Sequence, residues 1–185
     1  LHSTQSACSV SSSPAHRSHG TEVASLLVSR TYGMVPDAAL LAYQSIDDTS
    51  AAGDDCPMKA GVLPTEVSSL INKAINDGAS IINYSATSPS PSEHLKWAIA
   101  RAMSQGVIIT AGAGNTASDN TEHSLSQWSG VVGVSAIDTD GKFASYSSWG
   151  QGITTTAVGG PIIARDGSGQ ISSTQGTSFS SPIVA

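Results

Sequence analysis

Two consecutive segments of the sequence repeat one plan, an amphipathic helix followed by a short apolar strand, and this repeat is the strongest constraint on the fold. The apolar residues of each helix recur at the spacing of a single helical face. They are Val67, Leu70, Ile71, Ala74 and Ile75 in the first helix and Leu95, Ala98, Ile99, Ala102 and Met103 in the second. Gly78 and Gly106 end these helices, and strands at 80–84 and 107–109 follow them. Because such alternation is typical of parallel βαβ units, the sequence predicts an α/β fold with a mostly parallel central sheet and helices on both faces.

Weaker patterns predict the elements around this repeat. Residues 19–30 have helical spacing, and residues 38–46 and 131–137 are typical of strands. The Gly- and Thr-rich residues 150–175 predict loops with short β segments, and the Ser-rich residues 1–18 predict an exposed loop.

The length predicts a single domain spanning residues 1–185. The last residues continue a helical pattern up to Ala185, and the first residues do not resemble a natural start. We therefore expect the chain to be a piece of a longer protein.

The charge balance argues against several classes of partner. The chain has 8 Lys and Arg against 14 Asp and Glu, for a formal net charge of −6. No cluster of basic residues is available for a nucleic-acid backbone, and no apolar run reaches the roughly 18 residues that span a bilayer. We expect no nucleic-acid partner and no membrane segment. The spacing of the cysteines does not suggest a zinc site, and no motif predicts a metal or another cofactor.

Composition also bears on location. Ser and Thr are abundant, Lys and Arg are few, and the cysteines number two, Cys8 and Cys56. An even number of cysteines in such a chain fits an extracellular, secreted protein with one disulfide. Two unrelated small core residues explain the same pair equally well.

Small polar residues follow two of the predicted strands, at 85–87 and at 112–115. In a parallel sheet the carboxyl ends of the strands meet at one edge, and ligands bind there. The sequence therefore predicts a cleft at this edge.

Three short segments carry the chemistry. Residues 18–24 (SHGTEVA) place His19 at the predicted start of a helix, residues 113–115 (AGN) end a buried strand, and residues 176–182 (GTSFSSP) place Ser178 at the entry to a last helix. In this order, the set resembles the subtilisin-like serine proteases (subtilases, peptidase family S8), whose motifs are similar to H-G-T-H-V-A and G-T-S-M-A-S-P. The resemblance runs along the whole chain. It implies a subtilisin-like three-layer fold, a serine endopeptidase activity and a polypeptide substrate.

Each motif residue suits the chemistry that the resemblance implies. A serine hydroxyl becomes a good nucleophile when a base removes its proton, and imidazole is suited to that task near neutral pH. We therefore expect Ser178 to be the nucleophile and His19 the general base. Asn115 is expected to donate its side-chain amide to the oxyanion, together with backbone N–H groups at the helix start.

The resemblance also implies where the substrate binds. The backbone of Ser85, Ala86 and Thr87 is expected to pair with it as an added strand. Ala111, Gly112 and Ala113 resemble one wall of the pocket for the residue before the scissile bond.

The sequence departs from the family at the third catalytic residue. The family orders its triad Asp, His, Ser, but the first Asp of this chain is Asp37, after His19. Glu22 lies three residues beyond His19 on the same predicted helix, which places it beside that helix rather than behind the ring. We do not expect it to replace the Asp, which holds the imidazole and stabilises its cation.

Two accounts of the missing Asp stay open: a truncated portion of a working endopeptidase, or a catalytically inactive relative that binds peptides. The joint presence of His19, Asn115 and Ser178 favours the first. Serine-carboxyl peptidases share a Gly-Thr-Ser motif, but they place a carboxylate at the position of His19. We expect the 185-residue chain alone to have little or no activity and to fold poorly, because a missing central strand leaves backbone edges unpaired.

Calcium sites are common among relatives of this kind. Four carboxylates permit one without forming a specific motif: Asp47, Asp48, Asp54 and Asp55. The sequence does not determine the oligomeric state.

Overall fold

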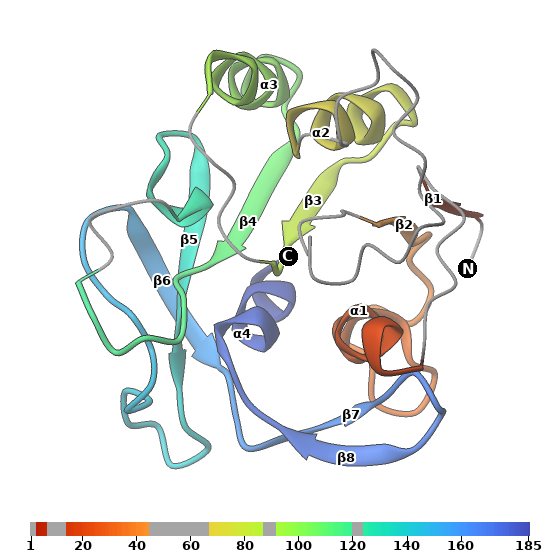
Figure 1. Cartoon of the computed structure of the whole chain (residues 1–185), viewed down its shortest axis with the longest axis vertical. Coiled ribbons are helices and arrows are strands. Elements are labelled where there is room, and N and C mark those ends of the chain that lie inside the picture. The colour runs from red at the N-terminus through yellow and green to blue at the C-terminus, as the bar shows by residue number, and fades with distance from the viewer. Residues whose placement is uncertain (1–2, 7–13, 45–66, 87–91, 120–123) are drawn as a thin grey trace.

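The computed structural model describes residues 3–6, 14–44, 67–86, 92–119 and 124–185. At its centre lies a sheet of four strands, all parallel, in the order β3-β4-β5-β6 (Figure 1). They are β3 (Ile81–Tyr84), β4 (Ile108–Gly112), β5 (Val131–Ile137) and β6 (Ile153–Val158). The predicted parallel sheet is confirmed, and the strand predicted at 131–137 has these bounds in the structure.

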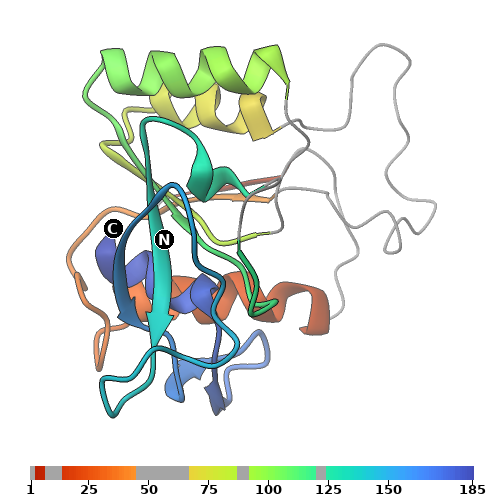
Figure 2. The same ribbon diagram turned by 90° about the vertical axis from the view of Figure 1, so that its left-hand side faces the viewer.

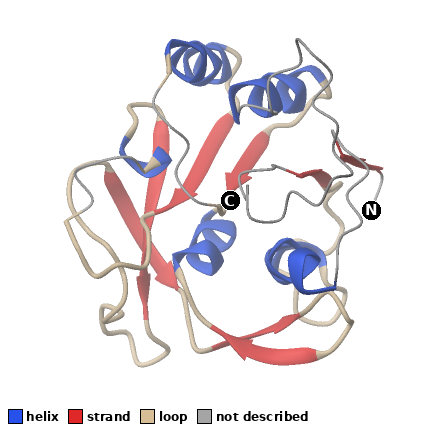
Figure 3. Ribbon diagram, in the orientation of Figure 1, coloured by secondary structure: helices blue, strands red, loops and turns tan. Residues whose placement is uncertain are grey.

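Helices cover both faces of this sheet, as predicted (Figures 2 and 3). On one face lie α2 (Val67–Asn76) and α3 (Glu93–Ser104), and on the other lie α1 (Pro14–Val28) and α4 (Thr177–Val184). The hydroxyl of Ser92 caps α3 by accepting a hydrogen bond from the backbone N–H of Leu95 at 3.1 Å. Gly78 and Gly106 follow α2 and α3 with φ angles of 86° and 70°, which favour glycine at a helix end.

The main core lies between the central sheet and the pair α2 and α3. The predicted apolar stripes of both helices face this core, except that Met103 is exposed and Leu70 is half-buried. A short 3₁₀ helix, η2 (Leu125–Gln127), adds Leu125 to the core before β5 begins. Apolar burial of this kind is the main term that stabilises the layers.

A second, smaller core joins α1 and α4. Val23 and Leu26 of α1 are buried against Phe179 of α4, and Tyr32 and Ile162 pack at its border. Because α4 also packs against all four central strands, α1 is held to the sheet through α4.

The prediction of an exposed loop at residues 1–18 is wrong for two segments. Ser3–Ser6 forms β1, which pairs in parallel with β2 (Leu41–Gln44). The helix α1 begins at Pro14, a residue that is favoured in the first turn because it has no N–H to leave unpaired. His19 therefore lies within α1 and not at its start.

Residues 150–175 contain more strand than loop. Besides β6, they form an antiparallel pair, β7 (Ile162–Arg165) and β8 (Ile171–Thr174), below α1 and α4 in Figure 1.

The strand β2 is tied to the helix layer by a polar contact. Tyr43 donates its hydroxyl to Asp77, just beyond α2, at 2.6 Å, and Lys73 forms an ion pair with the same carboxylate at 2.9 Å. Burial and the hydrogen bond to Asp77 raise the pKa of Tyr43 to about 12. The hydrogen bonds from Tyr43 and Lys73 lower the pKa of Asp77.

Within the described part of the chain, no helix has the length and apolar character needed to cross a membrane.

Candidate active site

The start of α4 lies directly against the loop that follows β4. Gly176, the N-cap of α4, has a φ angle of 147°, and a Cβ at this position would lie 3.2 Å from Nδ2 of Asn115. Glycine therefore lets Asn115 approach the helix start closely. Ser178 is half-buried in the first turn of α4, so these two predicted site residues lie at the same helix end.

The side-chain amide of Asn115 has a defined orientation. Its Oδ1 accepts a hydrogen bond from the backbone N–H of Thr177 at 2.8 Å. This contact uses the oxygen of the amide, because a backbone N–H can only donate. The Nδ2 group lies nearer to Gly176 than Oδ1 does, at 3.2 Å against 3.6 Å from the position of a Cβ on that glycine.

The segment that follows β4 is hydrogen-bonded to the first turn of α4. Thr177 Oγ1 accepts a hydrogen bond from the backbone N–H of Gly114 at 3.0 Å. A Cβ on Gly112 would lie 2.9 Å from the carbonyl oxygen of Thr177, a distance that real Cβ atoms do not reach. The helix can sit this close to the strand only because residue 112 has no side chain.

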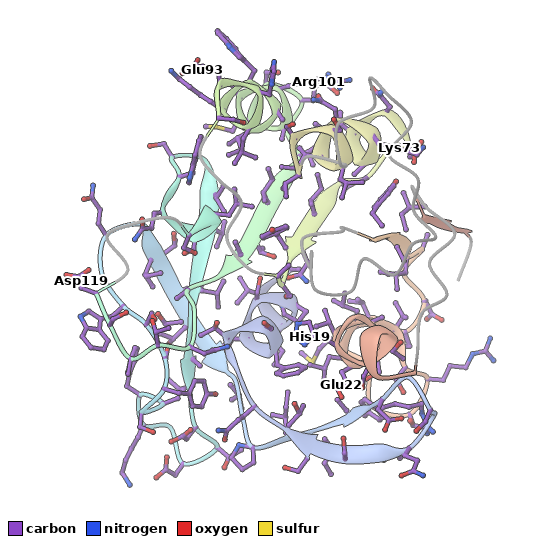
Figure 4. The ribbon with its side chains drawn as sticks, viewed as in Figure 1. His19, Glu22, Lys73, Glu93, Arg101 and Asp119 are labelled. Atoms are coloured by element: carbon purple, nitrogen blue, oxygen red, sulfur yellow. The ribbon has the colours of Figure 1, made fainter. Side chains whose placement is uncertain are left out.

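His19 projects from α1 toward α4 (Figure 4). Its side chain is exposed, and Nε2 donates to the carbonyl oxygen of Ser85 at 2.8 Å. Its ring meets Phe179, the residue after Ser178, edge to face, with centroids 5.6 Å apart and planes at 68°. Among the described residues no hydrogen bond joins His19 to the Ser178 hydroxyl. Such bonds often form only when substrate is bound.

Glu22 lies one helical turn from His19 on α1 (Figure 4). Its carboxylate accepts a hydrogen bond from the Ser18 hydroxyl at 2.9 Å. None of the carboxylates in the described ranges is hydrogen-bonded to His19. Three other labelled charged residues lie at the end of the molecule away from His19 in Figure 4, namely Lys73, Glu93 and Arg101.

The residues expected to bind substrate lie at the ends of β3 and β4. Ser85 is half-buried and Ala86 exposed directly after β3. Ala111 and Ala113 are buried, and Gly112 faces α4. Because the side chain of Ala111 packs in the main core, this residue can contribute only backbone to a pocket wall.

Several predicted positions fall outside the described residues. They are Cys8, Cys56, Thr87 and the four carboxylates Asp47, Asp48, Asp54 and Asp55. In the ranges that the structure does describe, no group of three or more His, Cys, Asp or Glu side chains is placed to hold a metal.

The structure adds polar residues that the sequence patterns did not single out. Thr177 holds Asn115, and Asn83 lies at the centre of a hydroxyl network between β3, β4 and α4. The only signal in the sequence was an asparagine inside the apolar run of 81–84, because such a residue needs partners when it is buried.

The family model and the relatives described below each match 90% or more of the chain. Residues 3–185 match the model described as "Subtilase family". Subtilisin DY of Bacillus licheniformis is 29% identical over 175 residues, which are 90% of this chain and 60% of that protein. The thermostable alkaline protease of Halalkalibacterium halodurans is 32% identical over 184 residues, which are 95% of this chain and 48% of that protein.

Among solved structures, the prenylagaramide maturation protease PagA superposes with a TM-score of 0.78 at 26% identity, covering 98% of this chain and 64% of that chain. A cold-adapted subtilisin-like serine proteinase, at 22% identity and a TM-score of 0.76, has the same fold. The predicted subtilisin-like α/β fold is confirmed. The chain spans about half to three fifths of the length of the curated relatives described here.

Proposed function

Because this chain belongs to the subtilase family, we propose that the protein that carries it is a serine endopeptidase and that the chain is part of its catalytic domain. In this proposal Ser178 is the nucleophile, His19 the general base and Asn115 an oxyanion donor. The substrate is a polypeptide. No cofactor takes part in the proposed reaction.

The main support is the orientation of Asn115. Its Oδ1 accepts from the Thr177 N–H, and its Nδ2, which has hydrogens to donate, lies beside Gly176 at the start of the helix that carries Ser178. A tetrahedral intermediate formed on Ser178 would carry its negative charge close to this helix start. Fixed donors at that point stabilise the charge without reorganising during the reaction.

The proposed reaction proceeds through an acyl-enzyme. His19 takes the proton of the Ser178 hydroxyl on its unprotonated ring nitrogen, which is Nδ1 while the Nε2 N–H donates to Ser85, as the serine oxygen attacks the carbonyl carbon of the scissile peptide bond. The protonated imidazole then gives this proton to the leaving amine, and water releases the acyl group by the same steps. Two contacts support the pairing of His19 with Ser178, since Ser85 accepts from His19 and donates its hydroxyl to the carbonyl of Ser178 at 2.7 Å.

The substrate is proposed to lie extended along Ser85, Ala86 and Thr87, with its backbone paired to the segment after β3. The backbone at 111–113 would form a wall of the adjoining pocket. We assign the carboxylate that orients His19 to a residue outside the described part of the chain. A secreted, extracellular location is proposed from the composition.

The test is covalent labelling of the full-length protein with a fluorophosphonate probe, followed by peptide mapping. We expect labelling at Ser178, together with loss of peptide hydrolysis. Ser178→Ala should abolish both, and His19→Ala should slow both. A folded protein that binds peptides but is not labelled at Ser178 would instead be the inactive peptide-binding relative.

A further inference from the structure

The carbonyl of Ser178 lacks the usual helical donor. In an α-helix the carbonyl of one residue accepts from the N–H four residues later. For Ser178 that residue is Pro182, which lies inside α4 and has no N–H. An unpaired carbonyl within a packed structure costs free energy, so this group needs another donor.

Ser85 supplies that donor from the end of β3. Its hydroxyl donates to the Ser178 carbonyl oxygen at 2.7 Å. Because a carbonyl can only accept, the single proton of Ser85 is committed to this bond. The Ser85 oxygen can then only accept from its other neighbour, Nδ2 of Asn83, at 2.9 Å.

The same reasoning fixes the rest of the network. With Nδ2 of Asn83 facing Ser85, its Oδ1 faces two buried hydroxyls. Ser181 of α4 donates to it at 2.7 Å and Thr110 of β4 at 3.2 Å. Asn83 is also paired with Thr110 in the register of β3 and β4. One side chain therefore links two strands of the sheet to the helix of Ser178.

We propose that Asn83 is a positioning residue for the nucleophile. It acts through Ser85, which it holds in the orientation that replaces the backbone donor missing at Pro182. The inference rests on the proposed function in one respect, namely that Ser178 is the reacting group. The chain of hydrogen bonds from Asn83 through Ser85 to Ser178, called the relay below, also lies beside His19, the proposed general base, because the Ser85 carbonyl accepts from His19 at 2.8 Å.

Asn83→Asp tests the direction of the relay. Aspartate has nearly the same shape and still accepts from Ser181 and Thr110, but it cannot donate to Ser85. The Ser85 hydroxyl is then drawn to the new carboxylate and leaves the Ser178 carbonyl. We expect the limiting rate of fluorophosphonate labelling at saturating probe to fall by about 10- to 100-fold, the range expected for a small misplacement of a reacting group. The half-saturating probe concentration should change much less.

Two further variants separate positioning from general stability. Pro182→Ala restores an N–H four residues after Ser178, so adding it to Asn83→Asp should recover most of the lost rate. Ser85→Ala should slow labelling as Asn83→Asp does, and combining these two changes should cost little more, because both break the same chain of bonds.

The matched control is Asn72→Asp. Asn72 of α2 is also half-buried, donates to the carbonyl of Ser68 at 3.0 Å and accepts from Arg101 at 2.8 Å, on the opposite face of the sheet. This change removes the bond to Ser68 and gives Arg101 a charged partner, and it should leave the limiting rate of labelling unaltered. If folded Asn83→Asp is labelled as fast as the wild type, or if Pro182→Ala gives no recovery, Asn83 does not position Ser178.

A measurement that does not depend on the reaction distinguishes failure of the proposed function from failure of the positioning role of Asn83. If the wild-type protein is not labelled at Ser178, the proposed function fails. The position of Ser178 can still be followed through its backbone amide resonance and that of Phe179. Asn83→Asp should shift both and Asn72→Asp neither. Unchanged resonances in Asn83→Asp would overturn the positioning role whatever the protein's activity. If Asn83→Asp does not fold, Ser85→Ala gives the same test, because it removes the donor to the Ser178 carbonyl, and unchanged resonances there would overturn the role as well.

Discussion

Gly112 and Thr177 lie in such close contact that a Cβ on the glycine would be 2.9 Å from the threonine carbonyl oxygen. The contact joins the end of β4 to the first residue of α4. Gly112→Ala must therefore push the helix from the strand or strain both, and we expect the unfolding free energy to fall by about 1–3 kcal/mol, as for other overpacked sites.

The control for this change is Gly20→Ala. Gly20 lies within α1, and a Cβ there would meet nothing within 4 Å. Alanine in a helix is favoured over glycine by roughly 0.5–1 kcal/mol, so this variant should gain stability. Urea denaturation of both variants measures the difference. Equal stability for the two would show that the β4–α4 contact is looser than its geometry indicates.

Asn115→Asp should separate the structural contact of Asn115 from its proposed chemistry. Aspartate still accepts from the Thr177 N–H, so stability should change little, but no amide donor remains for the oxyanion. We expect kcat to fall by about 10²–10³, the value measured in subtilisin itself for loss of this kind of donor. The readout is hydrolysis of a chromogenic peptide by the full-length protein. An active Asn115→Asp variant would remove Asn115 from the mechanism.

Phe179→Leu should disturb His19 without touching a polar group. Phe179 is buried, and the edge contact between the two rings is worth about 1 kcal/mol. We expect a loss of stability of this order and a shift of the His19 imidazole signals in the NMR spectrum. Phe143→Leu, at an exposed position, is the control and should change neither.

Tyr43→Phe should make stability less dependent on pH at both ends of the scale. The pKa of Tyr43 is raised to about 12. The contribution of Tyr43 to stability is therefore complete below its ordinary pKa of about 10, and it is lost as the pH rises through about 12. The pKa of Asp77 is lowered, so its contribution is present above its ordinary value and is lost as the pH falls through the lowered one. The difference in unfolding free energy between the wild type and Tyr43→Phe, measured by urea denaturation, should therefore be largest near neutral pH. It should become small in acid and in strong base. A gap independent of pH would show that the hydroxyl and Asp77 are not coupled.

The sequence predicted those parts of the fold that depend on local periodicity. The apolar stripes of α2 and α3 placed both helices and the strands after them, because burial on one face leaves a repeating pattern. β1 left no such pattern, since Ser3–Ser6 is polar throughout and forms a strand only by pairing with β2. The early start of α1 at Pro14 was missed because the Ser-rich residues before His19 are typical of loops.

The candidate site could be predicted as a set of residues but not as a set of contacts. The motifs named His19, Asn115 and Ser178, yet they did not reveal that Thr177 orients the Asn115 amide or that Ser85 accepts from His19. Asn83 and Ser181 are 98 positions apart, and their contact depends on where α4 settles on the sheet. Such contacts follow from tertiary packing, which no local pattern encodes.

Several hydrogen bonds that hold α4 come from much earlier in the chain, such as the bond from Ser85 to Ser178, 93 positions apart. Contacts of such long sequence separation form slowly in folding. During synthesis, the central strands and Asn115 leave the ribosome well before Ser178. On the proposed function, the nascent chain therefore has no assembled nucleophile site until α4 has docked.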